Sequence, residues 1–170
     1  MNSPILPYSF VPMTSEIVQR IMKWRYPEPY QVYNLSSDQE VLDELLDQRS
    51  PHFAVFDQQR ELIGFFAYGT AGRVGEDSYE PGLYSGDRML AVGLALHPDL
   101  TGKRLGEDFV KAGLEFARQS FAPQTFQFFV LGFNERALKL YERIGFKRVR
   151  TMIVHNRYGI SEFIEMHMKA

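Results

Sequence analysis

Two stretches of this 170-residue chain combine residue types that could do chemistry. The first is "HPDLTGKRLGEDFV" at 97–110, in which Gly102 and Gly106 flank Lys103 and Arg104 directly before a helical pattern. The first turn of a helix has free N–H groups and the positive end of the helix dipole, so it can hold an anion, phosphate above all. The same residues also fit an ordinary basic turn, and this stretch alone does not separate the two.

The spacing excludes two common phosphate-binding loops. No Ser or Thr follows Lys103, so this is not a nucleoside-triphosphate loop, and G-K-R-L-G does not match the dinucleotide fingerprint. Gly102 would permit a tight turn and close approach of a ligand. Gly106 would keep the first helical turn free of a side chain.

The second stretch is "NERALKLYERIGF" at 134–146. Asn134 is a typical N-cap, and Gly145 followed by Phe146 predicts a helix end of the Schellman type. Tyr141 lies seven residues after Asn134, two turns along the same side. Taken alone, Tyr141 fits an apolar position of an amphipathic helix that faces the core.

Apolar periodicity predicts the elements that must position these two stretches. We expect strands at 8–13, 52–56, 61–69, 88–96 and 125–131, a closing antiparallel pair within 146–155 and 161–169, and helices at 16–24, from Ser37, from the opening stretch to about Gln119, and from Asn134 to Gly145. Ser37 and Glu40 form a capping-box pattern. Gly93, inside a strand, indicates a bulge or a close backbone approach. This mixed order predicts one α/β or α+β domain over 1–170.

The bulk composition narrows the class of protein. The formal net charge is −2, so no basic excess points to nucleic acid. The chain has no cysteine, which excludes disulfides, thiolate metal sites and a cysteine-borne acyl intermediate. No apolar run is long enough for a membrane span, and no signal peptide is recognisable. We therefore expect a cytoplasmic protein with no membrane, nucleic-acid or metal partner.

The two stretches together, with the element order, resemble the GNAT superfamily of acyl-CoA-dependent N-acetyltransferases. The second stretch matches closely, whereas in the first Thr101 stands where the family usually has Arg or Gln, and Arg104 stands where it has its middle glycine. The resemblance implies a mixed, mostly antiparallel central sheet of about seven strands flanked by four helices. In that fold the sheet splays between two central parallel strands, and the gap receives the pantetheine arm of acetyl-CoA.

The resemblance also assigns site residues by position. Cofactor contacts are implied for Leu94, Ala95, Leu96, Gly102, Lys103, Arg104, Leu105, Gly106, Glu107 and Asn134, mostly through backbone groups. Tyr141 would protonate the departing thiolate as general acid, and a backbone N–H near Leu96 would stabilise the oxyanion. Arg104 either adds a contact to the pyrophosphate or clashes, if its position requires a positive φ.

The general base and the amine are not assigned by the sequence. The glutamate that some relatives place five residues before the motif asparagine is here Phe129. Candidates for the base are Glu76, Asp77, Glu80, Asp87, His97, or water. The acidic loop at 70–87 fits either a wall that attracts a cationic amine or a solvated loop. The segment "WRYPEPYQVYN" could line an acceptor pocket or simply pack as a connector.

Three functions follow from these patterns. The first is transfer of an acetyl group from acetyl-CoA to a primary amine, on a small molecule or a protein N-terminus, by direct attack in a ternary complex. The second is a non-catalytic acyl-CoA sensor or regulatory module. The third is a purely structural domain, which the paired motifs disfavour. The resemblance also suggests a homodimer.

Overall fold

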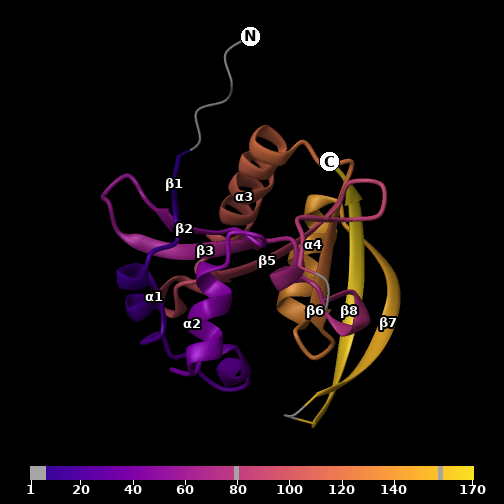
Figure 1. Ribbon diagram of the computed structural model, residues 1–170, viewed down its shortest axis with the longest axis horizontal. Coiled ribbons are helices and arrows are strands. Elements are labelled where there is room, and N and C mark those ends of the chain that lie inside the picture. Colours follow the sequence, from indigo (N-terminus) through magenta and orange to yellow (C-terminus); the bar gives the residue numbers. More distant parts are fainter. Residues whose placement is uncertain (1–6, 79–80, 157–158) are drawn as a thin grey trace.

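The computed structural model describes residues 7–78, 81–156 and 159–170. Within them the sheet has the strand order β1-β2-β3-β5-β6-β8-β7, with the short β4 paired to β5 (Figure 1). The strands are β1 Ser9–Pro12, β2 His52–Phe56, β3 Leu62–Tyr68, β4 Tyr84–Ser85, β5 Met89–Leu96, β6 Thr125–Leu131, β7 Lys147–Asn156 and β8 Gly159–Lys169. The helices are α1 Ser15–Ile21, α2 Gln39–Leu46, α3 Gly106–Phe121 and α4 Glu135–Ile144. The α+β class and the mixed, mostly antiparallel sheet are confirmed.

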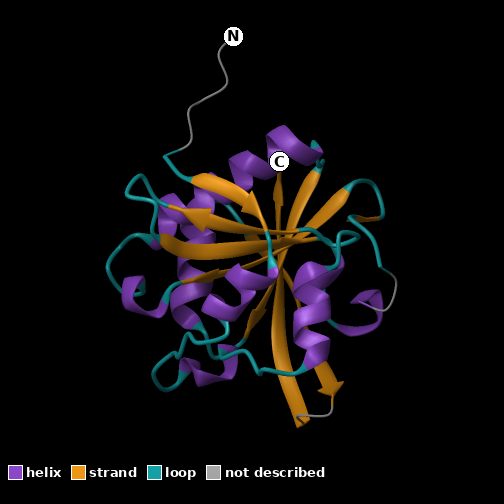
Figure 2. Cartoon of the chain, turned by 60° about the vertical axis from the view of Figure 1, so that its left-hand side comes forward, coloured by secondary structure: helices purple, strands orange, loops and turns teal. Residues whose placement is uncertain are grey.

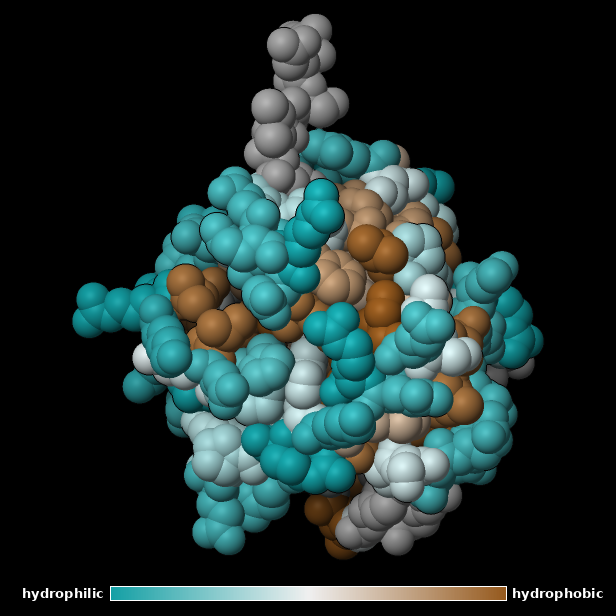
Figure 3. All heavy atoms as spheres, turned by 90° about the vertical axis from the view of Figure 1, so that its left-hand side faces the viewer, coloured by the Kyte–Doolittle hydropathy of each residue, from teal (hydrophilic) through white to brown (hydrophobic). Residues whose placement is uncertain are grey.

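Helices α3 and α4 lie on one face of the sheet, and α1 and α2 lie on the other (Figures 1 and 2). On one face, Phe109 and Leu114 of α3 and Leu138 of α4 pack with Phe66 and Phe126 in the main core. On the other face, α1 contributes Ile21 to a smaller core with Ala54 and Leu62. Among the described residues, no helix is both long and apolar enough to cross a bilayer. The side of the molecule that carries α1 is mostly hydrophilic, with scattered apolar groups (Figure 3).

The two halves of the described sheet are joined by hydrogen bonds only near the start of the parallel strands β5 and β6. β5 pairs with β6 at Met89–Thr125, Leu90–Phe126 and Ala91–Gln127, and the pairing then stops although both strands continue. Figure 1 shows β2, β3 and β5 running across the view while β6, β8 and β7 run down it. The predicted splay between the two central parallel strands is therefore present, and it leaves the second half of β5 with one open edge.

Local details differ from the sequence-based expectations at three places. The cap of α2 is Asp38 rather than Ser37, and the Asp38 side chain makes no capping hydrogen bond, so the predicted capping box was wrong. Helix α1 ends at Ile21, three residues before the predicted end at Trp24. The chain then makes a tighter turn, in which the Trp24 N–H donates to the Ile21 carbonyl. In the described connections the structure has 3₁₀ turns at Tyr30–Tyr33, Thr70–Gly72, Gly75–Ser78 and Pro98–Leu100.

Gly93 is not a bulge, because β3 and β5 stay in register through the Ala67–Gly93 pair. It marks a close approach instead. A Cβ on Gly72, in the turn above, would lie 3.0 Å from the Gly93 nitrogen. The backbone of that turn therefore packs directly on β5, on the face opposite α3 and α4.

Candidate active site

The open edge of β5 presents backbone groups that the sheet does not use. The His97 N–H donates to the Ile63 carbonyl of the β3 side at 2.7 Å. Backbone groups alternate sides along a strand, so Ala95 also faces β3, its register partner being Phe65. Leu94 and Leu96 therefore direct their N–H and C=O groups into the gap. Of the three strand residues expected at the pantetheine arm, these two have backbone groups that face the gap, and the Leu96 carbonyl accepts the Tyr26 hydroxyl there at 2.8 Å.

The loop after β5 leads into α3 through an unusual run of backbone conformations. Gly102 has φ of 74° and Arg104 has φ of 61°, both left-handed, whereas Leu105 returns to the right-handed helical region. Such alternation turns successive N–H groups toward one side and forms an anion-binding concavity. Within the described parts of the chain, no N–H from Gly102 to Asp108 donates a hydrogen bond to the backbone or a side chain. This free set of donors fits the pyrophosphate site expected from the sequence.

The two departures from the family pattern have distinct local explanations. The Thr101 hydroxyl donates to the Pro98 carbonyl at 2.8 Å, so it completes the preceding turn. Arg104 does occupy a position of positive φ, which an arginine adopts at a cost of about 1 kcal/mol. Gly106 serves packing, since a Cβ there would lie 3.2 Å from Leu140 Cδ2 of α4.

Asn134 caps α4, as expected, with its Oδ1 accepting the Ala137 N–H at 3.2 Å. Its Nδ2 is not free: it donates to the Tyr33 hydroxyl at 2.9 Å. The guanidinium of Arg136, two residues on, lies over the Tyr30 ring at 4.4 Å, and its Nη1 is 3.8 Å from a Cβ placed on Gly102. The start of α4 thus contacts the segment between α1 and α2, and the Arg136 side chain lies beside Gly102.

Tyr141 lies on the β6-facing side of α4 and is 7% exposed. Its ring stacks on Phe128 with centroids 4.2 Å apart. The helix ends in the predicted Schellman arrangement, with the Phe146 N–H bonded to the Tyr141 carbonyl and Gly145 at φ of 129°. Within the described residues the Tyr141 hydroxyl has no hydrogen-bond partner, and burial raises its pKa, so it remains a protonated donor.

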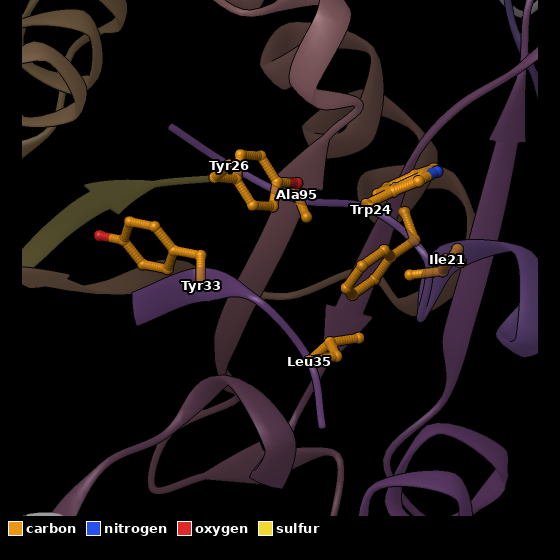
Figure 4. Close-up of a pocket in the computed structure, with 7 residues that line it drawn as sticks. Ile21, Trp24, Tyr26, Tyr33, Leu35 and Ala95 are labelled. Carbon is orange, nitrogen blue, oxygen red and sulfur yellow. The ribbon is translucent and has the colours of Figure 1, made fainter. Parts of the chain in front are cut away.

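The aromatic segment expected at the acceptor side does line a cavity (Figure 4). The cavity has a volume of about 20 Å³, room for about one water molecule. Its lining residues are Ile21, Trp24, Tyr26, Tyr33, Leu35, Phe65 and Ala95. The only polar side-chain groups in this lining are the Trp24 indole N–H and the two tyrosine hydroxyls. In Figure 4 the Tyr33 hydroxyl points away from the cavity.

The hydroxyl groups of Tyr26 and Tyr33 are functional candidates that sequence reasoning missed. Tyr26 donates to the Leu96 carbonyl at 2.8 Å, across 70 residues of sequence. Tyr33 accepts from Asn134, 101 residues away. Their segment was singled out by its rings alone, because nothing local indicates which distant groups a hydroxyl will reach.

The candidate bases fall into separate places. Asp87 is exposed in the turn before β5, nine residues and therefore about 30 Å from Leu96 along an extended strand. His97 is closer, but its Nδ1 accepts the Asp99 N–H at 3.1 Å, which places the proton of a neutral ring on Nε2. Glu80 and the side chains of Glu76 and Asp77 lie outside the described parts of the structure.

A buried carboxylate lies beside the position where the family glutamate is absent. Phe129 of β6 pairs with Glu165 of β8, and Glu165 is 4% exposed. Glu165 Oε1 accepts from Gln127 Nε2 at 3.3 Å and from Arg150 at 3.2 Å. The sequence contains no signal for this cluster, because it depends on the β6–β8 pairing. Among the described residues, no group of His, Asp and Glu could hold a metal ion.

A mixed sheet that opens between its parallel strands, next to a loop of free N–H groups, is the arrangement expected of an acyl-CoA-dependent N-acetyltransferase. The comparisons agree with this class. Residues 18–146 match the model of the acetyltransferase (GNAT) family. The chain therefore belongs to the GNAT family of acetyltransferases.

Solved structures of similar fold include spermidine N-acetyltransferases. A chimera of SpeG from Vibrio cholerae and hSSAT aligns with a TM-score of 0.71 at 16% identity, covering 96% of this chain and 95% of the other. Vibrio cholerae SpeG in complex with manganese ions aligns at 0.68 and 15% identity, covering 96% and 92%. A dodecameric structure of the Vibrio cholerae enzyme aligns at 0.66 and 16%, covering 96% and 94%. Comparison with curated protein sequences gives no match.

Proposed function

We propose that this protein transfers an acetyl group from acetyl-CoA to a primary amine, by direct attack in a ternary complex. The observation that carries the proposal is the end of β5–β6 pairing at Ala91–Gln127. Beyond it, the backbone groups of Leu94 and Leu96 face an unpaired edge between two strands. That edge leads to the free N–H groups that begin at Gly102.

The roles of the chain's own groups follow from their positions. The N–H groups from Gly102 to Glu107, with the side chain of Lys103, would hold the pyrophosphate. Leu94 and Leu96 would bond the pantetheine amides, as a neighbouring strand would. When bound, acetyl-CoA supplies an activated thioester. The chain's task is then to orient it, exclude water, and place hydrogen-bond donors.

Two groups are suited to the charge that develops in the reaction. A gap-facing N–H of Leu94 or Leu96 would stabilise the oxyanion of the tetrahedral intermediate. The Tyr141 hydroxyl, which has no hydrogen-bond partner among the described residues, would give its proton to the departing thiolate. The chain has no cysteine to carry the acetyl group, which favours direct attack by the neutral amine.

The Tyr26–Tyr33 cavity lies in the segment expected at the acceptor side, and we infer from its mostly apolar walls that the preferred amine has an apolar body. The lining of the Tyr26–Tyr33 cavity contains no carboxylate. Relatives by fold are spermidine N-acetyltransferases, and a polycation would be expected to need acidic partners that this lining does not supply. We therefore expect arylalkylamines and peptides with an apolar N-terminal residue to be better acceptors than spermidine. The homodimer stays a prediction, which sedimentation at several protein concentrations would test.

The experiment has two stages. First, thermal unfolding is followed with and without acetyl-CoA, and a ligand at about 100 times its dissociation constant adds about 2.7 kcal/mol to stability. No shift at millimolar acetyl-CoA would contradict binding. Second, release of free thiol from acetyl-CoA is measured with a panel of arylalkylamines, polyamines, amino sugars and peptides. Binding without thiol release by any amine would favour the sensor over the enzyme.

A further inference from the structure

Arg136, in the first turn of α4, is a positive charge that pairs with no carboxylate among the described residues. Other cations near the loop after β5 do have such a partner. Lys111 lies 2.9 Å from a carboxylate oxygen of Glu107, and Arg143 lies 3.8 Å from the other. Arg136 is exposed, and many exposed arginines are simply solvated. Its surroundings therefore decide whether it has a role.

The guanidinium of Arg136 is held in place by an aromatic platform. It lies over the Tyr30 ring, 4.4 Å from the ring centroid. That ring packs in turn against Phe133, with centroids 6.0 Å apart. A cation over an aromatic face is attracted by the ring, so the side chain loses part of its freedom before any ligand arrives. Arg136 is therefore better prepared for binding than a freely moving surface arginine.

The guanidinium is held beside the free N–H groups that follow β5. Arg136 Nη1 lies 3.8 Å from a Cβ placed on Gly102. Gly102 begins the run whose N–H groups donate to no backbone or side-chain group in the described parts of the chain. An anion in the loop would thus meet backbone donors on one side and a guanidinium on the other. A planar guanidinium matches the oxygens of a phosphate group, so the two elements together suit a phosphate ligand.

This arrangement bears on the departure of the loop from the family pattern. The family usually has Arg or Gln at the position of Thr101. Here the Thr101 hydroxyl donates to the Pro98 carbonyl and carries no charge. The cation beside the loop comes from α4 instead. The sequence alone does not indicate this, because only the fold brings Arg136 next to Gly102.

We propose that Arg136 binds the pyrophosphate of acetyl-CoA from α4, in place of the side chain that the family usually has at the position of Thr101, and that Tyr30 is its positioning residue. The loop, with its N–H groups and Lys103, would then hold the pyrophosphate from one side and Arg136 from the other. This inference rests on the proposed function, because it requires acyl-CoA in the site.

Three variants separate the charge, the shape and the placement of this side chain. Arg136→Gln removes a charge-assisted hydrogen bond, so it should bind acetyl-CoA about tenfold more weakly than the wild type at low ionic strength. Arg136→Lys keeps the charge but not the planar fork, so its loss should be smaller. Tyr30→Leu removes the platform and keeps the guanidinium, and it should cost about two- to threefold in affinity.

The matched control is Arg20→Gln, which makes the same change in net charge far from the loop. Arg20 is an exposed arginine of α1, and the described structure records no ion pair for it. Because distant exposed charges are screened by salt, this variant should bind acetyl-CoA within about twofold of the wild type. Thermal unfolding of each variant confirms that it is folded.

Affinity is measured by isothermal titration calorimetry of the full chain with two ligands, acetyl-CoA and acetyl-dephospho-CoA, at low and at high ionic strength. The second ligand lacks the 3′-phosphate and keeps the pyrophosphate. The proposal expects Arg136→Gln to lose the same factor with both ligands, and expects that factor to shrink at high salt. Should Arg136→Gln fail to fold, Arg136→Lys and Tyr30→Leu are compared with the wild type in the same way.

Three results would overturn the role of Arg136 and leave the proposed function standing. The first is wild-type affinity of Arg136→Gln for acetyl-CoA. The second is a loss seen with acetyl-CoA but not with acetyl-dephospho-CoA, which would place the guanidinium at the 3′-phosphate. The third is a loss that salt does not change and that Arg136→Lys shares in full, which would indicate lost packing and not lost charge. A wild type that binds neither ligand overturns the proposed function together with this inference.

Discussion

Replacing Tyr141 with phenylalanine removes one oxygen atom and little else. The side chain is 7% exposed, and its ring stacks on Phe128. Because the hydroxyl has no hydrogen-bond partner among the described residues, no bond is lost and no partner is left unpaired. We therefore expect the free energy of unfolding to change by less than about 0.5 kcal/mol. The variant is thus a clean test of chemistry, with folding held constant.

The expected loss is in turnover. General acid catalysis typically contributes about 100-fold to 10,000-fold to a rate. Taking the lower figure, Tyr141→Phe should reduce kcat by about 100-fold, which corresponds to about 2.7 kcal/mol in the barrier. The affinity for acetyl-CoA should stay within about twofold of the wild type, because the proton is needed only as the thiolate departs.

The pH dependence supplies a second check on the same residue. Burial raises the pKa of Tyr141 above its ordinary value of about 10, so the hydroxyl remains protonated through the alkaline range. The wild-type kcat should therefore not fall between about pH 8 and pH 10 through loss of this proton.

The assay follows thiol release at saturating acetyl-CoA and amine, using the best acceptor from the panel. Calorimetric titration with acetyl-CoA reports binding, and thermal unfolding reports stability. A Tyr141→Phe protein that binds acetyl-CoA and retains the wild-type kcat would refute the role of general acid. A large fall in stability would show instead that the hydroxyl has a structural partner.

Three further predictions concern the backbone, the core and a buried histidine. Arg104→Gly removes the strain of a left-handed backbone, so the free energy of unfolding in urea should stay unchanged or rise by up to about 1 kcal/mol. The affinity for acetyl-CoA should stay within about threefold of the wild type, and a loss of affinity above tenfold would contradict binding by the backbone. Gly113→Ala places a Cβ 2.1 Å from Phe66 Cζ and should cost about 1–3 kcal/mol, whereas wild-type stability would contradict this packing. Burial lowers the pKa of His52 from about 6.5 to about 4, so between these pH values the unfolded chain binds a proton that the folded protein does not. The free energy of unfolding should therefore fall by up to about 3 kcal/mol as the pH drops from 6.5 to 4, and His52→Gln should remove this pH dependence.

The parts of the site that lie close together in sequence were predictable. The Asn134 cap, the Schellman end at Gly145 and the buried face that carries Tyr141 each depend on residues within two helical turns. The splay of the sheet was predicted from the family resemblance and not from the apolar periodicity. Periodicity indicates where strands lie but not where their pairing stops. Gly93 illustrates the difference: its type indicated a special position, but only the fold shows a turn packed on the strand in place of a bulge.

Contacts between distant segments were not predictable. The bond from Tyr26 to Leu96 and the bond from Asn134 to Tyr33 join segments 70 and 101 residues apart. The Glu165 cluster likewise exists only because β8 lies between β6 and β7. Even a local expectation failed at α2, where Asp38 rather than Ser37 begins the helix. A capping pattern of this kind recurs at neighbouring positions, and tertiary contacts choose among them.

The altered loop shows why a departure in sequence need not be a departure in geometry. At the middle position the family usually has glycine, and here Arg104 keeps the positive φ that a glycine would adopt without strain. The Thr101 hydroxyl is used within its own turn, where it donates to the Pro98 carbonyl. We expect cofactor binding to depend on the direction of the loop's N–H groups, which any residue except proline can supply. The left-handed backbone at Arg104 costs about 1 kcal/mol of folding free energy, and the rest of the loop must hold it in place. A cost of this size is compatible with binding of acetyl-CoA.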